Sequence, residues 1–132
     1  MEMEYRATIE GTCPSKSNCY RIITIAGHAS LGKTKALREY ERSFYLQAGA
    51  LRGAGIRDLF ALSVRVFYPS MSHDLDNSLK VLLDCLQGCG AIRNDNRCVS
   101  ITAEKFIDKA RPRVELTLVP LEIGENEEAQ TK

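Results

Sequence analysis

The sequence has no long uninterrupted run of apolar residues and no cysteine pair at the C-x-x-C spacing of a structural zinc site. A helix that crosses a bilayer needs roughly 20 consecutive apolar residues, so no membrane segment is predicted. The first residues, MEMEYRATIEG, also lack the basic and apolar zones of a signal peptide. We therefore expect the chain to be cytoplasmic.

Five cysteines are an odd number for a disulfide framework, and a cytoplasmic setting keeps thiols reduced. Cys85 and Cys89 are four positions apart, but His28 and His73 are distant from both in the sequence. Zinc sites draw on clustered cysteine and histidine ligands. We therefore interpret the cysteines as small core residues rather than as zinc ligands.

The net charge of +1 conceals a division along the chain. Residues 122–132 carry four acids and one lysine, which leaves 17 basic and 13 acidic residues in 1–121. A chain of 132 residues fits one domain. We expect a folded domain over 1–121, followed by an acidic tail with too few apolar residues to order itself. The basic excess of the domain permits a phosphate-binding face.

Hydrophobic periodicity predicts an α+β domain in which two main helices pack against a mixed β-sheet. The helices are expected over 33–50, with an apolar stripe of Leu37, Tyr40, Phe44 and Tyr45, and over 74–86, ended by Gly88 and Gly90. The last two strands alternate and are expected to form a hairpin. Strands are expected within 4–11, 20–26, 59–68, 98–106 and 111–120.

The segment Gly27 to Thr34, GHASLGKT, matches the G-x-x-x-x-G-K-[ST] pattern of a phosphate-binding P-loop. An NTPase also needs a second acid that holds magnesium at the end of a buried strand. The downstream segment ALSVRVFYPS ends without one. We therefore favour a basic loop and helix start that contacts DNA phosphates, and keep nucleotide binding as an alternative.

Aspartates open the second predicted helix in the segment HDLDNSLK. Asp74 and Asp76 bracket a leucine that must face the core, and Lys80 lies one helical turn beyond Asp76. A third acid, Asp95, lies in a polar loop after the helix. Helix capping and a simple salt bridge are the alternative explanations. Three neighbouring carboxylates repel unless a divalent cation neutralises them, which points to magnesium.

The segment HDLDNSLKVLLDCLQGCGAIRNDNRCV resembles the signature region of the RusA family of Holliday junction resolvases. The family pattern is an Asp-x-Asp-Asn pair opening a helix, a lysine one turn later, and a further aspartate after a glycine-ended helix. The resemblance extends more weakly over most of residues 5–120. This chain has His73 where the family pattern has an arginine.

The resemblance implies a RusA-like homodimer that cuts four-way DNA junctions in pairs of symmetric hydrolytic events. It implies that Asp74, Asp76 and Asp95 bind Mg²⁺, with Mn²⁺ as the alternative ion, and that Lys80 is the catalytic lysine. The alternative functions are a junction-binding protein with little catalysis and a P-loop-like nucleotide-binding protein. The candidate DNA-contacting residues are Lys16, Lys33, Lys35, Arg38, Arg42 and His73.

Overall fold

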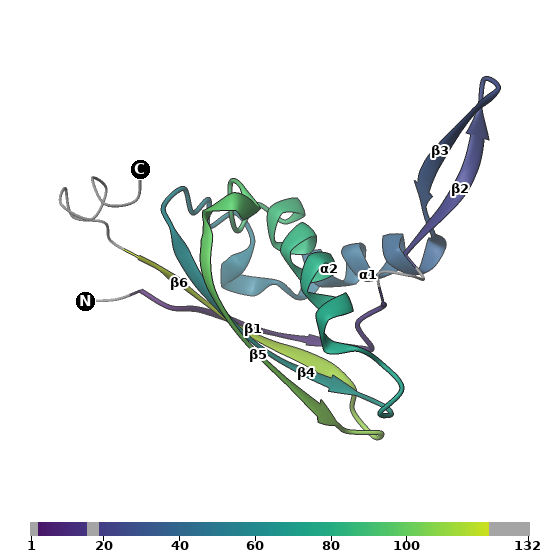
Figure 1. Ribbon diagram of the computed structural model, residues 1–132. Helices are drawn as coiled ribbons and strands as arrows, with labels where there is room; N and C mark the ends of the chain where they lie inside the picture. Colours follow the sequence, from purple (N-terminus) through teal and green to yellow (C-terminus); the bar gives the residue numbers. More distant parts are fainter. Residues whose placement is uncertain (1–2, 16–18, 122–132) are drawn as a thin grey trace.

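The computed structural model describes residues 3–15 and 19–121. Two helices lie on one face of a four-stranded mixed sheet, and a separate two-stranded hairpin projects from this body (Figure 1). The predicted α+β class is confirmed. In chain order the elements are β1 (Tyr5–Glu10), β2 (Tyr20–Ile25), β3 (His28–Lys33), α1 (Lys35–Gln47), the 3-10 helix η2 (Gly49–Leu51), β4 (Phe60–Tyr68), α2 (Leu75–Gly88), the 3-10 helix η3 (Asp95–Arg97), β5 (Cys98–Ile107) and β6 (Arg113–Pro120).

The predicted domain boundary after residue 121 stays a prediction, and the predicted tail over 122–132 lies outside the described residues, as does Lys16. Among the residues that the structure does describe, none of the helices has the length and apolar character that a bilayer-spanning helix requires.

The strand order of the sheet is β1-β6-β4-β5, so β4 lies between β6 and β5. Val64 of β4 is opposite Leu116 of the antiparallel β6 and opposite Ala103 of the parallel β5. The expected hairpin of the last two strands is therefore wrong. Alternation fixes which side chains share a face, but it does not encode which strands are neighbours. The parallel β4 and β5 are joined by a crossover that contains α2.

The core lies between the sheet and the two helices. Alternate residues of β4 are buried, and β4 therefore presents a continuous apolar row to the helices. Helix α1 buries Leu37, Tyr40 and Phe44 as expected, but Tyr45 is 48% exposed and does not belong to the core stripe. Helix α2 continues through Gly88, so the chain leaves the helix at Gly90, whose φ is 77°.

The cysteines are free thiols. Cys13, Cys19, Cys85 and Cys89 are buried in the core cluster, in agreement with the interpretation from the sequence. Burial raises the pKa of the Cys13 thiol to about 12, so this side chain stays protonated near neutral pH.

The P-loop-like segment forms part of the projecting hairpin. Ile25 pairs with His28, which leaves Ala26 and Gly27 as a two-residue turn with φ of 51° and 80°. Positive φ at both positions is what a tight hairpin turn requires. Residues 28–33 form β3, and the expected loop there is wrong. Because β3 is paired with β2 along its length, its backbone N–H groups do not converge on a phosphate.

Helix α1 begins at Lys35, two residues later than expected. The side chain of Thr34 caps the helix by accepting a hydrogen bond from the Leu37 N–H at 3.3 Å. Thr34 therefore acts as a helix cap at the place where a P-loop uses its hydroxyl to bind magnesium.

We predict from this geometry that the protein does not bind ATP with magnesium. Isothermal titration calorimetry with millimolar nucleotide should give no saturable heat, because no phosphate cradle is formed by residues 27–34. Saturable binding that is abolished in a Lys33→Ala variant would contradict this expectation and return the nucleotide-binding alternative to consideration.

Candidate active site

The loop between β4 and α2 leads directly to Asp74, the first acid of the candidate site. The ring of His73 stacks on the ring of Tyr68 with centroids 4.6 Å apart and an interplanar angle of 8°. Lys105, on the neighbouring strand β5, donates hydrogen bonds to the carbonyl oxygens of Met71, at 3.0 Å, and of His73. The ammonium group thus ties the loop to the sheet immediately before Asp74.

Asp74 occupies the N-cap position of α2, yet its side chain makes no capping hydrogen bond. Its Oδ2 accepts a hydrogen bond from Asn77 Nδ2 at 3.5 Å. Asp76 lies in the first turn, and both aspartates are exposed, whereas Leu75 between them packs on the core. The expectation that the two acids bracket an inward-facing leucine is therefore confirmed. Neither carboxylate has an ion-pair partner among the described residues.

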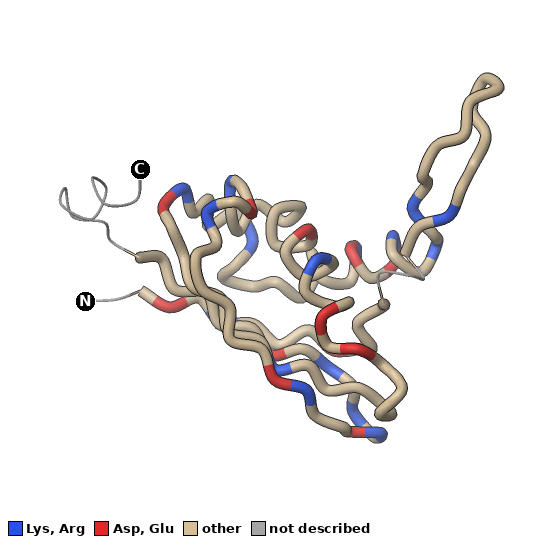
Figure 2. The backbone as a smooth tube through the Cα atoms, viewed as in Figure 1, with Lys and Arg blue, Asp and Glu red and all other residues tan. Residues whose placement is uncertain are grey.

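The two aspartates lie close enough to Tyr68 to affect its phenol. Burial raises the pKa of Tyr68, Ser78 opposes this through a hydrogen bond, and Asp74 and Asp76 raise it further. Ser78 is buried and donates a hydrogen bond to the Leu75 carbonyl oxygen at 2.6 Å. The hydrogen bond of the buried Ser78 therefore fixes the first turn of α2 on its core side, while Asp74 and Asp76 are exposed. Figure 2 shows acidic residues at this start of the helix.

Lys80 connects α2 to the loop that follows it. Its Nζ lies 3.0 Å from Asp84 Oδ1 and 3.0 Å from Asp95 Oδ2. The hydrogen bond to Asp84 is the largest cause of a raised pKa of Lys80, and the hydrogen bond to Asp95 is the next largest. The ammonium form is therefore retained. Asp84 and Asp95 are thus the ion-pair partners of Lys80, and no ion pair joins it to Asp76 within the described part of the chain.

Asp95 is the first residue of η3, and the side chain of Asn94 caps this turn by accepting a hydrogen bond from the Asn96 N–H at 3.0 Å. The turn directs Asp95 back to α2, where it meets Lys80. Lys80 is four residues after Asp76, about 6 Å along a helix axis. The chain therefore brings Asp95 to within about two turns of the aspartates at the helix start.

The three acids do not form one closed ligand set. Within residues 3–15 and 19–121, no three side chains of the acidic, histidine or cysteine type come together as a metal-binding group. The carboxylates of Asp74 and Asp76 suit a hard divalent cation by chemistry, and both lack a cationic partner in the part described. The assignment of metal ligands stays a prediction.

Two of the predicted DNA-contacting lysines form ion pairs with acids of α1. Lys33 lies 3.0 Å from Glu41, whose hydrogen bond raises the pKa of the lysine, and Lys35 lies 3.7 Å from Glu39. Arg38 donates a hydrogen bond to the Lys33 carbonyl oxygen. Arg42 lines a hollow between α1 and α2, and His73 is half-buried. These contacts with DNA remain predictions.

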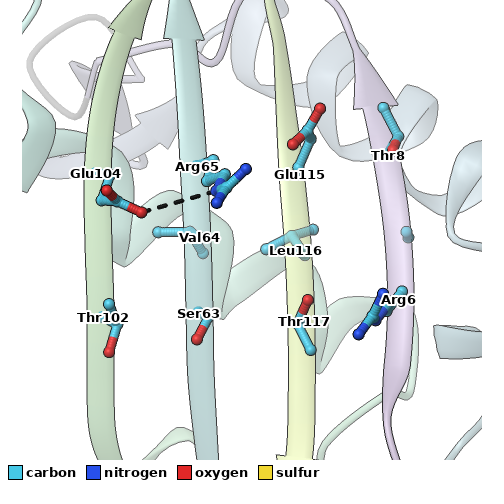
Figure 3. A pocket seen from close by; sticks show the side chains of 11 residues that line it. Arg6, Thr8, Ser63, Val64, Arg65, Thr102, Glu104, Glu115, Leu116 and Thr117 are labelled. Carbon is cyan, nitrogen blue, oxygen red and sulfur yellow. Dashed lines mark ion pairs between the residues drawn. The ribbon is translucent and has the colours of Figure 1, made fainter.

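A hollow of about 710 Å³ lies on the face of the sheet that the helices leave open (Figure 3). Its lining mixes hydroxyl groups with ion pairs such as Arg65 and Glu104, which are 3.7 Å apart. Asp74, Asp76, Lys80 and Asp95 do not contribute to it. The candidate active site is therefore at the start of α2 and not in this hollow.

A family model described as "Endodeoxyribonuclease RusA" matches residues 24–119, which include Asp74, Asp76, Lys80 and Asp95. The matched region defines an enzyme class, the endodeoxyribonucleases, which hydrolyse phosphodiester bonds within DNA. Because the match covers most of the chain, the protein belongs to the RusA family, whose members resolve Holliday junctions.

No curated protein matches this chain. Among solved structures, the chain is similar to the crystal structure of a GTPyS-form protofilament of Bacillus thuringiensis serovar israelensis TubZ, with 9% identity and a TM-score of 0.42. The similarity covers 97% of this chain and 27% of the TubZ chain.

Two residues of the site were missed by sequence reasoning. Asp84 lies four positions after Lys80, and this spacing on a predicted helix was available as a signal for an ion pair. Lys105 gave no such signal, because its role depends on β5 lying parallel to β4, which alternation does not encode.

We predict that Lys105→Met loosens the loop before Asp74 and lowers junction cleavage about tenfold or more, since misplaced catalytic groups lose rate steeply. Hydrogen exchange should increase in residues 69–74. The matched control is Lys109→Met, which removes an exposed lysine from the turn after β5. Equal cleavage and equal exchange in the two variants would contradict the positioning role.

Proposed function

We propose that the protein is a magnesium-dependent, structure-selective endodeoxyribonuclease that resolves four-way DNA junctions by paired symmetric hydrolysis as a homodimer. The observation that carries this proposal is the ion pair between Lys80 and Asp95. It brings the acid that follows α2 back to the helix whose first turn carries two exposed carboxylates. Family membership supports junction resolution as the activity.

Asp74, Asp76 and Asp95 are the residues that would hold the cation. Carboxylate oxygens are the ligands that magnesium prefers, and Mn²⁺ accepts the same set. A bound divalent cation would neutralise charge on the scissile phosphate and make water a better nucleophile. Asp74 and Asp76 are exposed at the helix start, where a phosphate group can approach them from solvent.

Lys80 supplies a positive charge next to these acids. Its hydrogen bonds to Asp84 and Asp95 keep the ammonium protonated, and half of its side chain is exposed. In the proposed reaction the ammonium donates to a phosphate oxygen and stabilises the charge that develops on it. When Asp95 binds the cation, the ion pair with Asp84 would keep Lys80 in its position.

The first test uses a labelled synthetic four-way junction with magnesium or manganese. We expect the wild-type protein to cut it and Asp76→Asn and Asp95→Asn to lose on the order of 100-fold or more in rate, because each change removes a negatively charged oxygen ligand. The control, Glu104→Gln, alters an exposed acid on the open face of the sheet and should cut normally.

Junction binding in a chelator separates catalysis from recognition. All four proteins should bind with similar affinity, since the two aspartates act in hydrolysis. A wild-type protein that binds the junction but is not activated by either cation would favour the alternative of a junction-binding protein. Equal cutting by wild type and Asp76→Asn would refute the assignment of the acids.

The homodimer is part of the proposal, since paired cuts need two active sites. The β2–β3 hairpin is the surface that we assign to the second copy. Ile22 and Leu31 are cross-strand partners and are 76% and 71% exposed. Residues 22–32 contain no Lys, Arg, Asp or Glu, so the hairpin suits an apolar protein partner better than a phosphate backbone. An isolated two-stranded hairpin is also only marginally stable in water.

We predict that the double variant Ile22→Ser, Leu31→Ser weakens the dimer by at least about tenfold, because two exposed apolar side chains lose their burial on association. Sedimentation equilibrium measures the change. The control is Leu46→Ser, which alters an exposed leucine of α1. A double variant that is as dimeric as the control would remove the hairpin from the interface. The cytoplasmic location stays a prediction.

A further inference from the structure

A further hollow, of about 470 Å³, lies beside η3 and is rich in arginine. Figure 2 shows basic segments gathered at this end of the molecule, where β5 begins. The hollow is separate from the α1 residues considered above. Its lining consists of Arg57, Arg93, Asn94, Asn96 and Arg97.

The three arginines lack acidic partners. Arg57, Arg93 and Arg97 are exposed, and the part of the chain described shows no ion pair or side-chain hydrogen bond for any of them. Asp58 follows Arg57 in the sequence but does not line the hollow. Three neighbouring guanidinium groups repel one another, so an anion would stabilise the arrangement.

The arginines of the sheet show the opposite pattern. Arg65 lies 3.7 Å from Glu104, and Arg111 lies 2.5 Å from Glu10. Arg113 contacts both Asp108 and Glu115. Unneutralised arginine charge is therefore a property of the surface next to η3 and not of the sheet.

The backbone under the hollow is fixed. Ile56 and Ile92 form a parallel bridge, and both are buried. The Arg93 N–H donates to the Ile56 carbonyl oxygen at 2.9 Å, which places Arg93 beside Arg57 although the two are distant in sequence. The Arg97 N–H donates to the Asn94 carbonyl oxygen at 3.2 Å. The hollow is thus built on hydrogen-bonded backbone and not on a loose loop.

The turn η3 has two functional sides. Asp95 turns to Lys80 on α2, whereas its neighbours Asn94 and Asn96 line the hollow together with Arg97. A phosphodiester backbone that crosses η3 would therefore contact the arginines on one side and reach the Lys80–Asp95 pair on the other. Only the short turn η3 separates the arginines from the Lys80–Asp95 pair, so the two places could contact neighbouring phosphates of one DNA strand.

We propose that this hollow binds a backbone phosphate of the DNA strand that enters the active site, with Arg93 and Arg97 as its main ligands and Arg57 and the two asparagine amides completing it. The guanidinium fork matches two phosphate oxygens at once, and amides donate to the same group. This inference rests on the proposed function, since it assigns the path of that substrate. The residues lie outside the set of DNA contacts expected from the sequence.

The experiment measures junction affinity in a chelator as a function of salt, with Arg93→Gln, Arg97→Gln and the double variant of the full chain. Each phosphate contact contributes about 0.9 to the slope of log affinity against log salt. Each hollow of the proposed homodimer binds one phosphate, so the double variant, which loses both sites, should lose about 2 in slope. Each single variant keeps one arginine ligand and should lose less than the double variant. Arg65→Gln, which makes the same charge change on the sheet, should keep the wild-type slope.

Two controls distinguish loss of charge from misfolding and DNA binding from binding of a small anion. Arg97→Lys retains the charge and should keep most of the slope, so a loss in Arg97→Gln alone reports the charge and not misfolding. A titration with inorganic phosphate at constant ionic strength tests whether the hollow binds a small free anion instead of a DNA phosphate. Arginine-dependent binding of free phosphate with an unchanged junction slope would assign the hollow to a small anion and overturn the inference.

An unchanged slope in the double variant, with normal cutting by the wild type, would overturn the inference while the proposed function stands. Loss of slope in the double variant, with no cutting by the wild type in either cation, would refute the proposed function while the DNA contact stands. The two failures are therefore distinguishable in one set of proteins.

Discussion

The double ion pair of Lys80 is the contact on which the arrangement of the site depends. The lysine lies in the second turn of α2 and holds Asp95, which the chain reaches only after the helix has ended. These groups are partly exposed, so the pairs contribute little to folding stability. Their effect is positional: they bring the polar turn η3 back along the helix and leave Asp74 and Asp76 without a cation. Negative charge is thereby concentrated at one end of α2.

The sheet topology makes this contact available. Because β4 and β5 are parallel, the chain must cross from the end of β4 to the start of β5, and α2 lies within that crossover. The same neighbouring strands let Lys105 reach the loop before Asp74. The acids are consequently placed by elements that the core fixes, through the buried row of β4 and the apolar stripe of α2. Rigid elements are what a site needs when its groups must keep one geometry.

Residue patterns predicted those features that depend on local order. Alternation located β1 and β4, and helical periodicity located α1 and α2, because each pattern reports which side chains face the core. The P-loop-like motif misled the assignment of β3, since glycine also serves a hairpin turn at Gly27 and Thr34 also serves as a helix cap. The prediction that the last two strands form a hairpin was wrong, because strand pairing depends on the order of the strands in the sheet and not on the alternation within each strand. For the site, spacing identified the aspartates and Lys80, while the contact of Lys105 required knowledge of the strand order.

The distribution of paired and unpaired charge separates two kinds of basic surface. Lys33 at the end of β3 and Lys35 at the start of α1 each contact a glutamate of α1, which partly neutralises their charge. Next to η3 the arginines come from two distant segments joined by the bridge of Ile56 and Ile92, and acids are absent from the lining of the hollow. DNA binds most strongly to basic side chains that have no acidic partner. Each phosphate then displaces only solvent and counterions and does not have to compete with a carboxylate. In the proposed complex, the direction of the bound strand is therefore set by the end of α2 where the chain returns to the sheet. The contacts with DNA expected at α1 stay predictions.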